Sequence, residues 1–129
     1  MPEEVIPASK PRILCTEDDA DTRELLCLLL ELEGFEATCV PDPAQALSLA
    51  TQEKFDLYLL DNWLPGMNGE HLCQKLRELD PATPILFYSG ATAPSVRARA
   101  MEAGAQGYVL KPAHPNELAA EIRRLLQRK

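Results

Sequence analysis

Short apolar runs alternate with longer amphipathic stretches along most of this chain. Five of the runs are rich in Leu, Ile, Val, Phe or Tyr and stop at turn-forming or polar residues, as buried strands do. They cover residues 12–16, 35–40, 55–60, 84–88 and 107–110. The pattern predicts five strands, each followed by a helix.

The stretches after these runs carry apolar residues at helical spacing. In the first, leucines between residues 25 and 32 predict a broad apolar helix face that ends at Gly34. The second opens with Asp42, Pro43 and Gln45, a combination typical of a capped helix start. The last three are marked by these residues: Leu72, Leu76 and Leu79; Val96, Ala100 and Ala103; Leu118, Ile122 and Leu125.

The strict alternation of strand and helix predicts an α/β fold. Strands that are apolar over most of their length are typical of a parallel sheet covered on both faces. We therefore expect a doubly wound five-stranded parallel sheet, in the strand order 2-1-3-4-5, with helices on both faces. Residues 12–129 would form this domain, and residues 1–11, which are polar and rich in proline, a flexible leader.

The composition argues against nucleic-acid binding and against membrane contact. The formal charge of -7 argues against a basic surface, so we expect no nucleic acid to bind this domain itself. No apolar run is long enough to span a membrane, and no signal-peptide pattern opens the chain. We expect a cytoplasmic protein without membrane contact.

Four cysteines fall within the apolar strand and helix patterns: Cys15, Cys27, Cys39 and Cys73. None forms a C-x-x-C pair. We interpret them as buried, reduced thiols of a cytosolic protein, with a zinc or redox site as the alternative.

Polar groups gather at the carboxyl ends of the predicted strands. Glu17 and Asp18 follow the first strand, and Asp61 follows the third. Ser89 and Lys111 follow the fourth and fifth. Because parallel strands all point one way, these side chains should share one edge of the sheet.

Three clustered carboxylates repel one another unless a cation lies among them. Mg²⁺ suits such a site because it prefers oxygen ligands and keeps places for water and phosphate. A hydroxyl and an ammonium group on the other side would hold a phosphoryl group, whose transfer depends on positioning and charge neutralisation. A carboxylate placed there can act as the nucleophile.

Each of these residues has an ordinary interpretation when taken alone. Acids at residues 17–21 also suit the start of a helix, Ser89 suits a turn, and Lys111 suits a solvated surface. Their joint occurrence at four strand ends favours a functional site.

Four segments resemble the two-component response-regulator receiver domain, of the CheY-like kind. They are ILCTEDD, DLYLLDNWLPGMNG, ILFYSG and GYVLKP. The resemblance covers the chain from residue 12 to its C-terminus. It implies the flavodoxin-like or CheY-like version of the predicted fold and a role in signal transduction.

The resemblance also implies roles for the acids. Asp61 would be the phosphorylated residue, and Asp18 would bind Mg²⁺ directly. Glu17 would help to hold the metal, and Trp63 would supply its backbone carbonyl. Arg23, six residues after Glu17, supports this alignment.

The later motifs carry the other roles. Ser89 and Lys111 would bind the phosphoryl group, and Ser89 and Tyr108 would form the switch pair. Tyr108 also has a plain interpretation as a packed aromatic residue. Pro112 matches a turn position whose preceding peptide bond is usually cis in this family.

The function implied is a Mg²⁺-dependent phosphorelay. A histidine kinase or a phosphotransfer protein would donate the phosphoryl group. The face formed by residues 94–129 would then change and be recognised by a downstream protein or output domain. The same face allows a homodimer. Such a domain is not an enzyme in the ordinary sense, since it catalyses only its own phosphorylation and dephosphorylation.

Three alternatives belong to other classes or lack the phosphorylation. An aspartyl-phosphate phosphohydrolase would use a D-x-D pair, and Asp19 and Asp21 have that spacing but leave Asp61 unexplained. A flavin-binding module would need a glycine-rich phosphate loop where the acidic residues 17–21 stand. A receiver that only docks, without phosphorylation, is the third.

Overall fold

The computed structural model describes residues 10–127 and shows strands and helices in strict alternation. The strands are β1 (Arg12–Thr16), β2 (Glu36–Val40), β3 (Leu57–Leu60), β4 (Ile85–Ser89) and β5 (Gly107–Leu110). The helices are α1 (Ala20–Leu32), α2 (Pro43–Gln52), α3 (Gly69–Leu79), α4 (Pro94–Glu102) and α5 (Pro115–Leu126). Of the predicted leader, all but its last two residues lies outside the described part of the chain.

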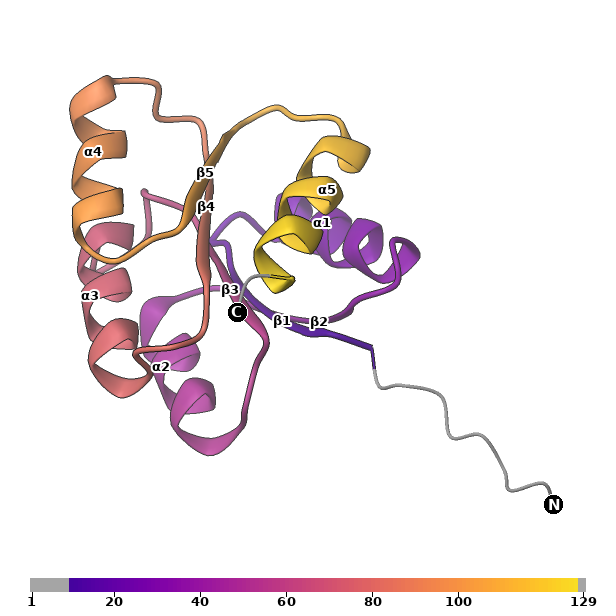
Figure 1. Ribbon diagram of the computed structural model, residues 1–129, viewed down its shortest axis with the longest axis horizontal. Coiled ribbons are helices and arrows are strands. Elements are labelled where there is room, and N and C mark those ends of the chain that lie inside the picture. Colours follow the sequence, from indigo (N-terminus) through magenta and orange to yellow (C-terminus); the bar gives the residue numbers. More distant parts are fainter. Residues whose placement is uncertain (1–9, 128–129) are drawn as a thin grey trace, which may run out of the picture.

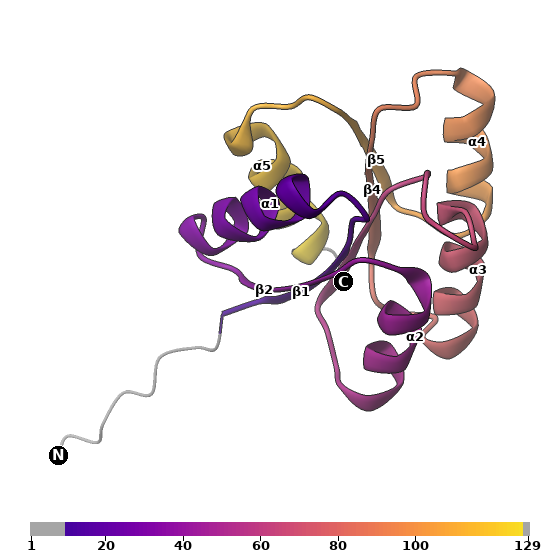
Figure 2. The same ribbon diagram turned by 180° about the vertical axis from the view of Figure 1, so that it is seen from behind.

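The sheet is parallel throughout and has the order β2-β1-β3-β4-β5. Helices α1 and α5 cover one face, and α2, α3 and α4 cover the other (Figures 1 and 2). The predicted fold class and strand order are therefore confirmed. The strand bounds differ from the predicted ones by at most two residues at either end.

Each face of the sheet has its own hydrophobic core. Leu60, Leu72 and Phe87 belong to the core on the side of α2, α3 and α4. Ile13 and Ile122 belong to the core on the side of α1 and α5. The central strand β3 contributes to both cores, so all four of its residues are buried. This burial explains why its sequence is apolar without alternation.

Helix α1 buries less than its leucines led us to expect. Only Leu26 and Leu30 are buried, whereas Leu25, Leu28 and Leu32 are 56%, 55% and 73% exposed. The predicted apolar face is therefore only partly buried. A helix lying on one face of a sheet presents only one stripe of residues to it, spaced by three or four positions.

The ends of the first two helices agree with the sequence signals. Gly34 follows α1 with φ 98°, a conformation that glycine adopts without a steric penalty. Asp42 caps α2 by accepting from the backbone N–H of Gln45, whose side chain donates back to the same carboxylate.

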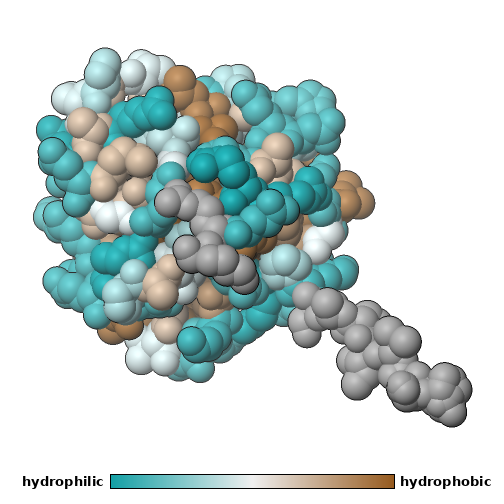
Figure 3. Space-filling model, viewed as in Figure 1, coloured by the Kyte–Doolittle hydropathy of each residue, from teal (hydrophilic) through white to brown (hydrophobic). Residues whose placement is uncertain are grey.

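The surface mixes hydrophilic and hydrophobic residues, with hydrophilic ones covering much of the face in Figure 3. None of the helices within residues 10–127 combines the length and the apolar character needed to cross a membrane. The four cysteines are free. Two of them, Cys15 and Cys73, are buried as predicted, but Cys27 and Cys39 are only partly buried.

Candidate functional site

The carboxyl edge of the sheet brings four charged residues together. Glu17, Asp18 and Asp61 each place a carboxylate oxygen within 4.8 Å of the other two. The ammonium nitrogen of Lys111 lies 2.7 Å from Oε1 of Glu17 and 3.0 Å from Oδ2 of Asp61. Glu17 and Asp61 are buried, and Asp18 is exposed. The predicted grouping of three acids and one lysine is thus present.

Asp61 is held by the backbone that follows it. Its Oδ1 accepts from the N–H groups of Asn62, at 2.7 Å, and Trp63, at 3.4 Å. The loop returns at Gly69, whose N–H donates to the carbonyl of Asn62 at 2.9 Å. A Cβ atom on Gly69 would lie only 2.1 Å from the carbonyl oxygen of Asp61. The start of α3 therefore packs directly on the backbone of the central acid.

The acids that follow β1 make different contacts. Glu17 accepts from Lys111, and its backbone carbonyl accepts from the guanidinium of Arg23 at 3.0 Å. Asp19 instead caps α1, because its carboxylate accepts from the backbone N–H and the hydroxyl of Thr22. Asp19 is therefore engaged in a helix cap, which weakens the phosphohydrolase alternative based on the Asp19–Asp21 pair.

Lys111 keeps its charge in this setting. Burial lowers its pKa, but the hydrogen bonds and negative charges of Asp61 and Glu17 outweigh burial, so its pKa is raised above the ordinary value. The ammonium also lies 5.4 Å from the ring centre of Tyr88, a cation–π distance. The Lys111–Pro112 peptide bond is cis, as expected for that bond.

Ser89 and Tyr108, the predicted switch pair, meet through a residue that sequence reasoning missed. The side-chain nitrogen of Asn62 lies 3.1 Å from Oγ of Ser89 and 2.6 Å from the hydroxyl of Tyr108. Tyr108 is 8% exposed, and its hydroxyl donates to the carbonyl of Ala91 at 2.9 Å. The one sequence signal for Asn62 was an amide directly after the central acid.

The donor set fits a hard divalent cation. The three acids offer only carboxylate oxygens, which Mg²⁺ prefers, and Asp18 leaves one side open to solvent. The side chain of Trp63 is 63% exposed. Its backbone carbonyl as a ligand stays a prediction.

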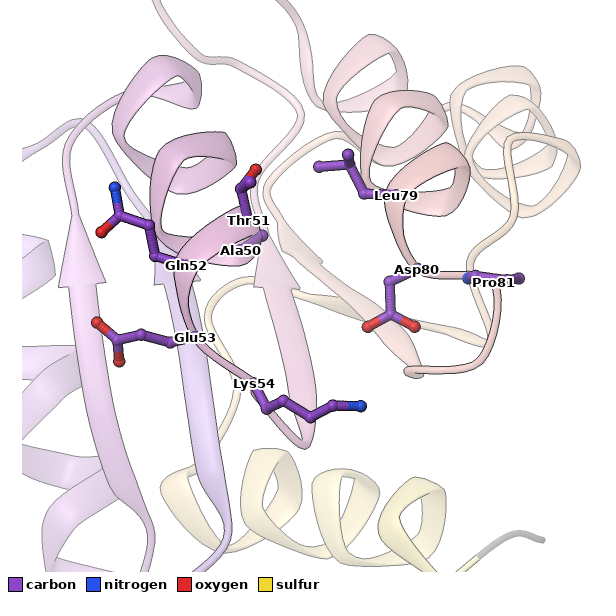
Figure 4. Close-up of a pocket in the computed structure, with 8 residues that line it drawn as sticks. All are labelled: Ala50, Thr51, Gln52, Glu53, Lys54, Leu79, Asp80 and Pro81. Atoms are coloured by element: carbon purple, nitrogen blue, oxygen red, sulfur yellow. The ribbon is translucent and has the colours of Figure 1, made fainter.

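A separate pocket of about 400 Å³ lies at the opposite, amino edge of the sheet. It is formed where α2 and α3 end, before β3 and β4 begin, and is lined by Lys54 and Asp80 among others (Figure 4). None of the predicted site residues lines it. The charged group at the carboxyl edge is therefore the candidate site.

Comparison with known proteins agrees with this geometry. Residues 13–123 match the family described as the response regulator receiver domain. The chain is 40% identical over 119 residues to the DNA-binding response regulator MtrA of Mycolicibacterium paratuberculosis. That match covers 92% of this chain and 52% of MtrA. The chain thus spans about half the length of the curated relatives it matches.

Solved structures show the same fold. A CheY-like receiver domain protein from Methanospirillum hungatei JF-1 superposes with a TM-score of 0.87 at 30% identity, covering 92% of this chain and 94% of that one. The receiver domain of the sensor histidine kinase PA1611 from Pseudomonas aeruginosa PAO1 gives 0.86 at 25% identity, covering 92% and 99%. That structure has a magnesium ion coordinated in its active-site cleft.

Proposed function

The chain belongs to the response regulator receiver domain family, and from this premise we propose that Asp61 accepts a phosphoryl group from a phosphohistidine donor. The observation that carries the proposal is the position of Lys111. Its ammonium bridges Asp61 and Glu17 in a group of three acids at the carboxyl edge of the sheet. Such an edge is where open α/β sheets bind ligands.

Each residue of the site would have its own role in the phosphoryl transfer. A carboxylate oxygen of Asp61 attacks phosphorus as the bond from phosphorus to the donor imidazole nitrogen breaks, and the electron pair returns to that nitrogen. Lys111 neutralises the phosphoryl oxygens, and the hydroxyl of Ser89 donates to one of them. The backbone N–H groups of Asn62 and Trp63 keep the carboxylate of Asp61 oriented. The domain would catalyse this step, and the later hydrolysis, on itself alone.

We assign the cation site to Asp18, Asp61 and Glu17, with the carbonyl of Trp63 as a further ligand. Mg²⁺ bound there would neutralise charge on the phosphoryl oxygens during transfer. Asp18 is best placed for direct ligation, because it is exposed and has neither the lysine bridge nor the cap that engages its neighbours. Glu17 already binds Lys111 at 2.7 Å, which favours a supporting role.

We propose that a histidine kinase or a phosphotransfer protein supplies the phosphoryl group. The response would reach a downstream protein or output domain through α4, β5 and α5. This face has a cavity of about 440 Å³ lined by Tyr108, Arg97 and Glu117 among others. Tyr108 therefore joins the site to the surface of this face. A homodimer through the same face is compatible with the exposed Leu110 of β5.

A cytoplasmic location is part of this proposal. All four cysteines are free, which fits a reducing compartment.

The proposal is tested by incubating the protein with acetyl phosphate and Mg²⁺ and measuring its intact mass. We expect a gain of one phosphoryl group, lost in Asp61→Asn and kept in the matched control Asp56→Asn. Asp56 is suitable because it binds the backbone N–H of Arg12, at the start of the first strand and away from the site. Omission of Mg²⁺ should also abolish the gain.

Fluorescence of Trp63, the single tryptophan, gives a second readout beside Asp61. Mg²⁺ should change its intensity, and beryllofluoride, a phosphoryl mimic, should change it further. An unchanged mass and an unchanged fluorescence in the wild type would reject phosphorylation and favour the docking-only alternative.

A further inference from the structure

A single amide joins the carboxyl ends of three neighbouring strands. Asn62 follows β3 and is 5% exposed. Its side-chain nitrogen lies 3.1 Å from Oγ of Ser89 at the end of β4 and 2.6 Å from the hydroxyl of Tyr108 on β5. An amide nitrogen carries two hydrogens and accepts none, so Asn62 must be the donor in both contacts.

The direction of every hydrogen bond in this group then follows. Oγ of Ser89 accepts from Asn62 and from the backbone N–H of Ala91, at 3.1 Å. A hydroxyl oxygen has two lone pairs and one hydrogen, so the hydrogen of Ser89 is left to donate to another group. The hydroxyl of Tyr108 accepts from Asn62 and must donate to the carbonyl of Ala91, 2.9 Å away.

The ring of Tyr108 is held on the inner side by the same contacts. It stacks on Phe87 with ring centres 5.8 Å apart and an angle of 10° between the ring planes. Because the ring is 8% exposed, its hydroxyl needs partners inside the protein, and Asn62 and Ala91 supply them. The protein's own contacts thus suffice to hold the ring inward.

We infer that Asn62 is a positioning residue that couples Ser89 to Tyr108: its amide presents the Ser89 hydroxyl as a donor to the phosphoryl group and holds the Tyr108 ring inward beforehand. The part that concerns the phosphoryl group rests on the proposed phosphorylation of Asp61. The part that concerns Tyr108 does not depend on it. Any shift of Ser89 toward the phosphoryl group would also pull on the amide and so reach Tyr108.

The variant Asn62→Leu tests the coupling, because leucine is close to asparagine in size but has no N–H group in its side chain, while its backbone N–H can still donate to Asp61. Asn116→Leu is the matched control, since Asn116 is exposed on α5. The position of the ring is read from the ¹⁹F resonance of fluorotyrosine at residue 108, assigned with Tyr108→Phe. The affinity for beryllofluoride at saturating Mg²⁺ is read from the fluorescence of Trp63.

In Asn62→Leu we expect a shifted or broadened Tyr108 resonance without any phosphoryl donor, and an affinity for beryllofluoride about tenfold weaker. The affinity for Mg²⁺ should stay within about twofold, since the carboxylates are untouched. General loss of structure would weaken both affinities, so this difference separates positioning from folding. If either the resonance or the beryllofluoride affinity matches the wild type, the coupling is refuted.

A second variant covers the case in which Asn62→Leu does not fold. Tyr108→Phe keeps the ring and removes only the oxygen that Asn62 contacts, so the amide is less constrained. We expect its affinity for beryllofluoride to fall about threefold, and an unchanged affinity would overturn the coupling. A wild type that binds no beryllofluoride and gains no phosphoryl mass would instead reject the proposed function, while the Tyr108 resonance would still decide the contact with Asn62.

Discussion

The ammonium nitrogen of Lys111 lies 2.7 Å from Oε1 of Glu17, although 94 residues separate them in the sequence. The contact joins the end of β1 to the turn after β5, on either side of Asp61. Since Asp61 lies 3.0 Å from the same nitrogen, two buried acids share one ammonium group. The lysine therefore serves both stability and the proposed chemistry.

Replacing Lys111 by methionine should destabilise the protein by about 1–3 kcal/mol, because two buried carboxylates lose a charged donor. Mg²⁺ should restore more stability to this variant than to the wild type, because the lysine no longer competes with the metal for the carboxylates. Thermal unfolding with and without Mg²⁺ measures both effects. Lys75→Met, at an exposed position of α3, is the control. Equal Mg²⁺ effects in variant and wild type would contradict the bridging role of Lys111.

The raised pKa of Lys111 predicts a pH dependence on the alkaline side. The stabilisation is complete below the ordinary pKa of 10.5 and is lost as the pH rises through the higher pKa of the folded state. In that range the free energy of unfolding should fall more steeply for the wild type than for Lys111→Met. Denaturant unfolding at a series of pH values gives the two slopes, and parallel slopes would disprove the assignment.

The sequence was sufficient to predict the sheet and most residues of the candidate site. The buried run that ends at Asp61 has an apolar pattern that only a central strand explains, and parallel strands place Glu17 and Lys111 at the same edge. These inferences need only local patterns and strand direction. The distances between the groups, and which of the acids at residues 17–21 caps α1, needed the structure.

Asn62 shows why the remainder was not predictable. Its partners are 27 and 46 residues away, and nothing around position 62 indicates that its amide reaches them. The burial of the leucines of α1 could not be predicted for a related reason. Which stripe of a leucine-rich helix is buried depends on how the helix lies on the sheet, and the pattern of α1 allowed more than one choice.

Arg77 is expected to carry a large part of the stability at the amino edge. Its guanidinium donates to the carbonyls of Asp80, Thr83 and Gly104 at 2.7–2.9 Å, and to Oε1 of Gln106 at 2.9 Å. Arg77→Met removes all four bonds. The carbonyl of Gly104 keeps the side-chain amide of Gln106 as a donor, and Oε1 of Gln106 keeps the backbone N–H of Ile85. The carbonyls of Asp80 and Thr83 lose the guanidinium donor, so we expect a loss of about 3 kcal/mol in denaturant unfolding. Phosphorylation should persist, because this group is remote from Asp61.

Arg99→Met is the matched control for Arg77. Its ion pair with Glu70 is at the surface, with the Arg99 side chain 57% exposed, so the loss should stay below about 1 kcal/mol. Equal losses in the two variants would show that the contacts of Arg77 contribute no more than a surface ion pair.

Gly69 is the position where a single methyl group should damage the site most directly. A Cβ there would lie 2.1 Å from the carbonyl oxygen of Asp61 and 2.9 Å from the ring of Phe87, so the start of α3 must move away. We expect Gly69→Ala to cost about 2 kcal/mol or more and to lower the yield of phosphorylated protein. Both are measured, by denaturant unfolding and by intact mass with acetyl phosphate.

Gly90→Ala supplies the comparison, since Gly90 follows Ser89 closely in the sequence but has open space where a Cβ would stand. Its stability should stay within about 0.5 kcal/mol of the wild type, or rise slightly because alanine restricts the unfolded chain. If Gly69→Ala were tolerated as well as Gly90→Ala, the packing of α3 on Asp61 would not be what holds the acid in place. The backbone N–H groups of Asn62 and Trp63 would then have to suffice.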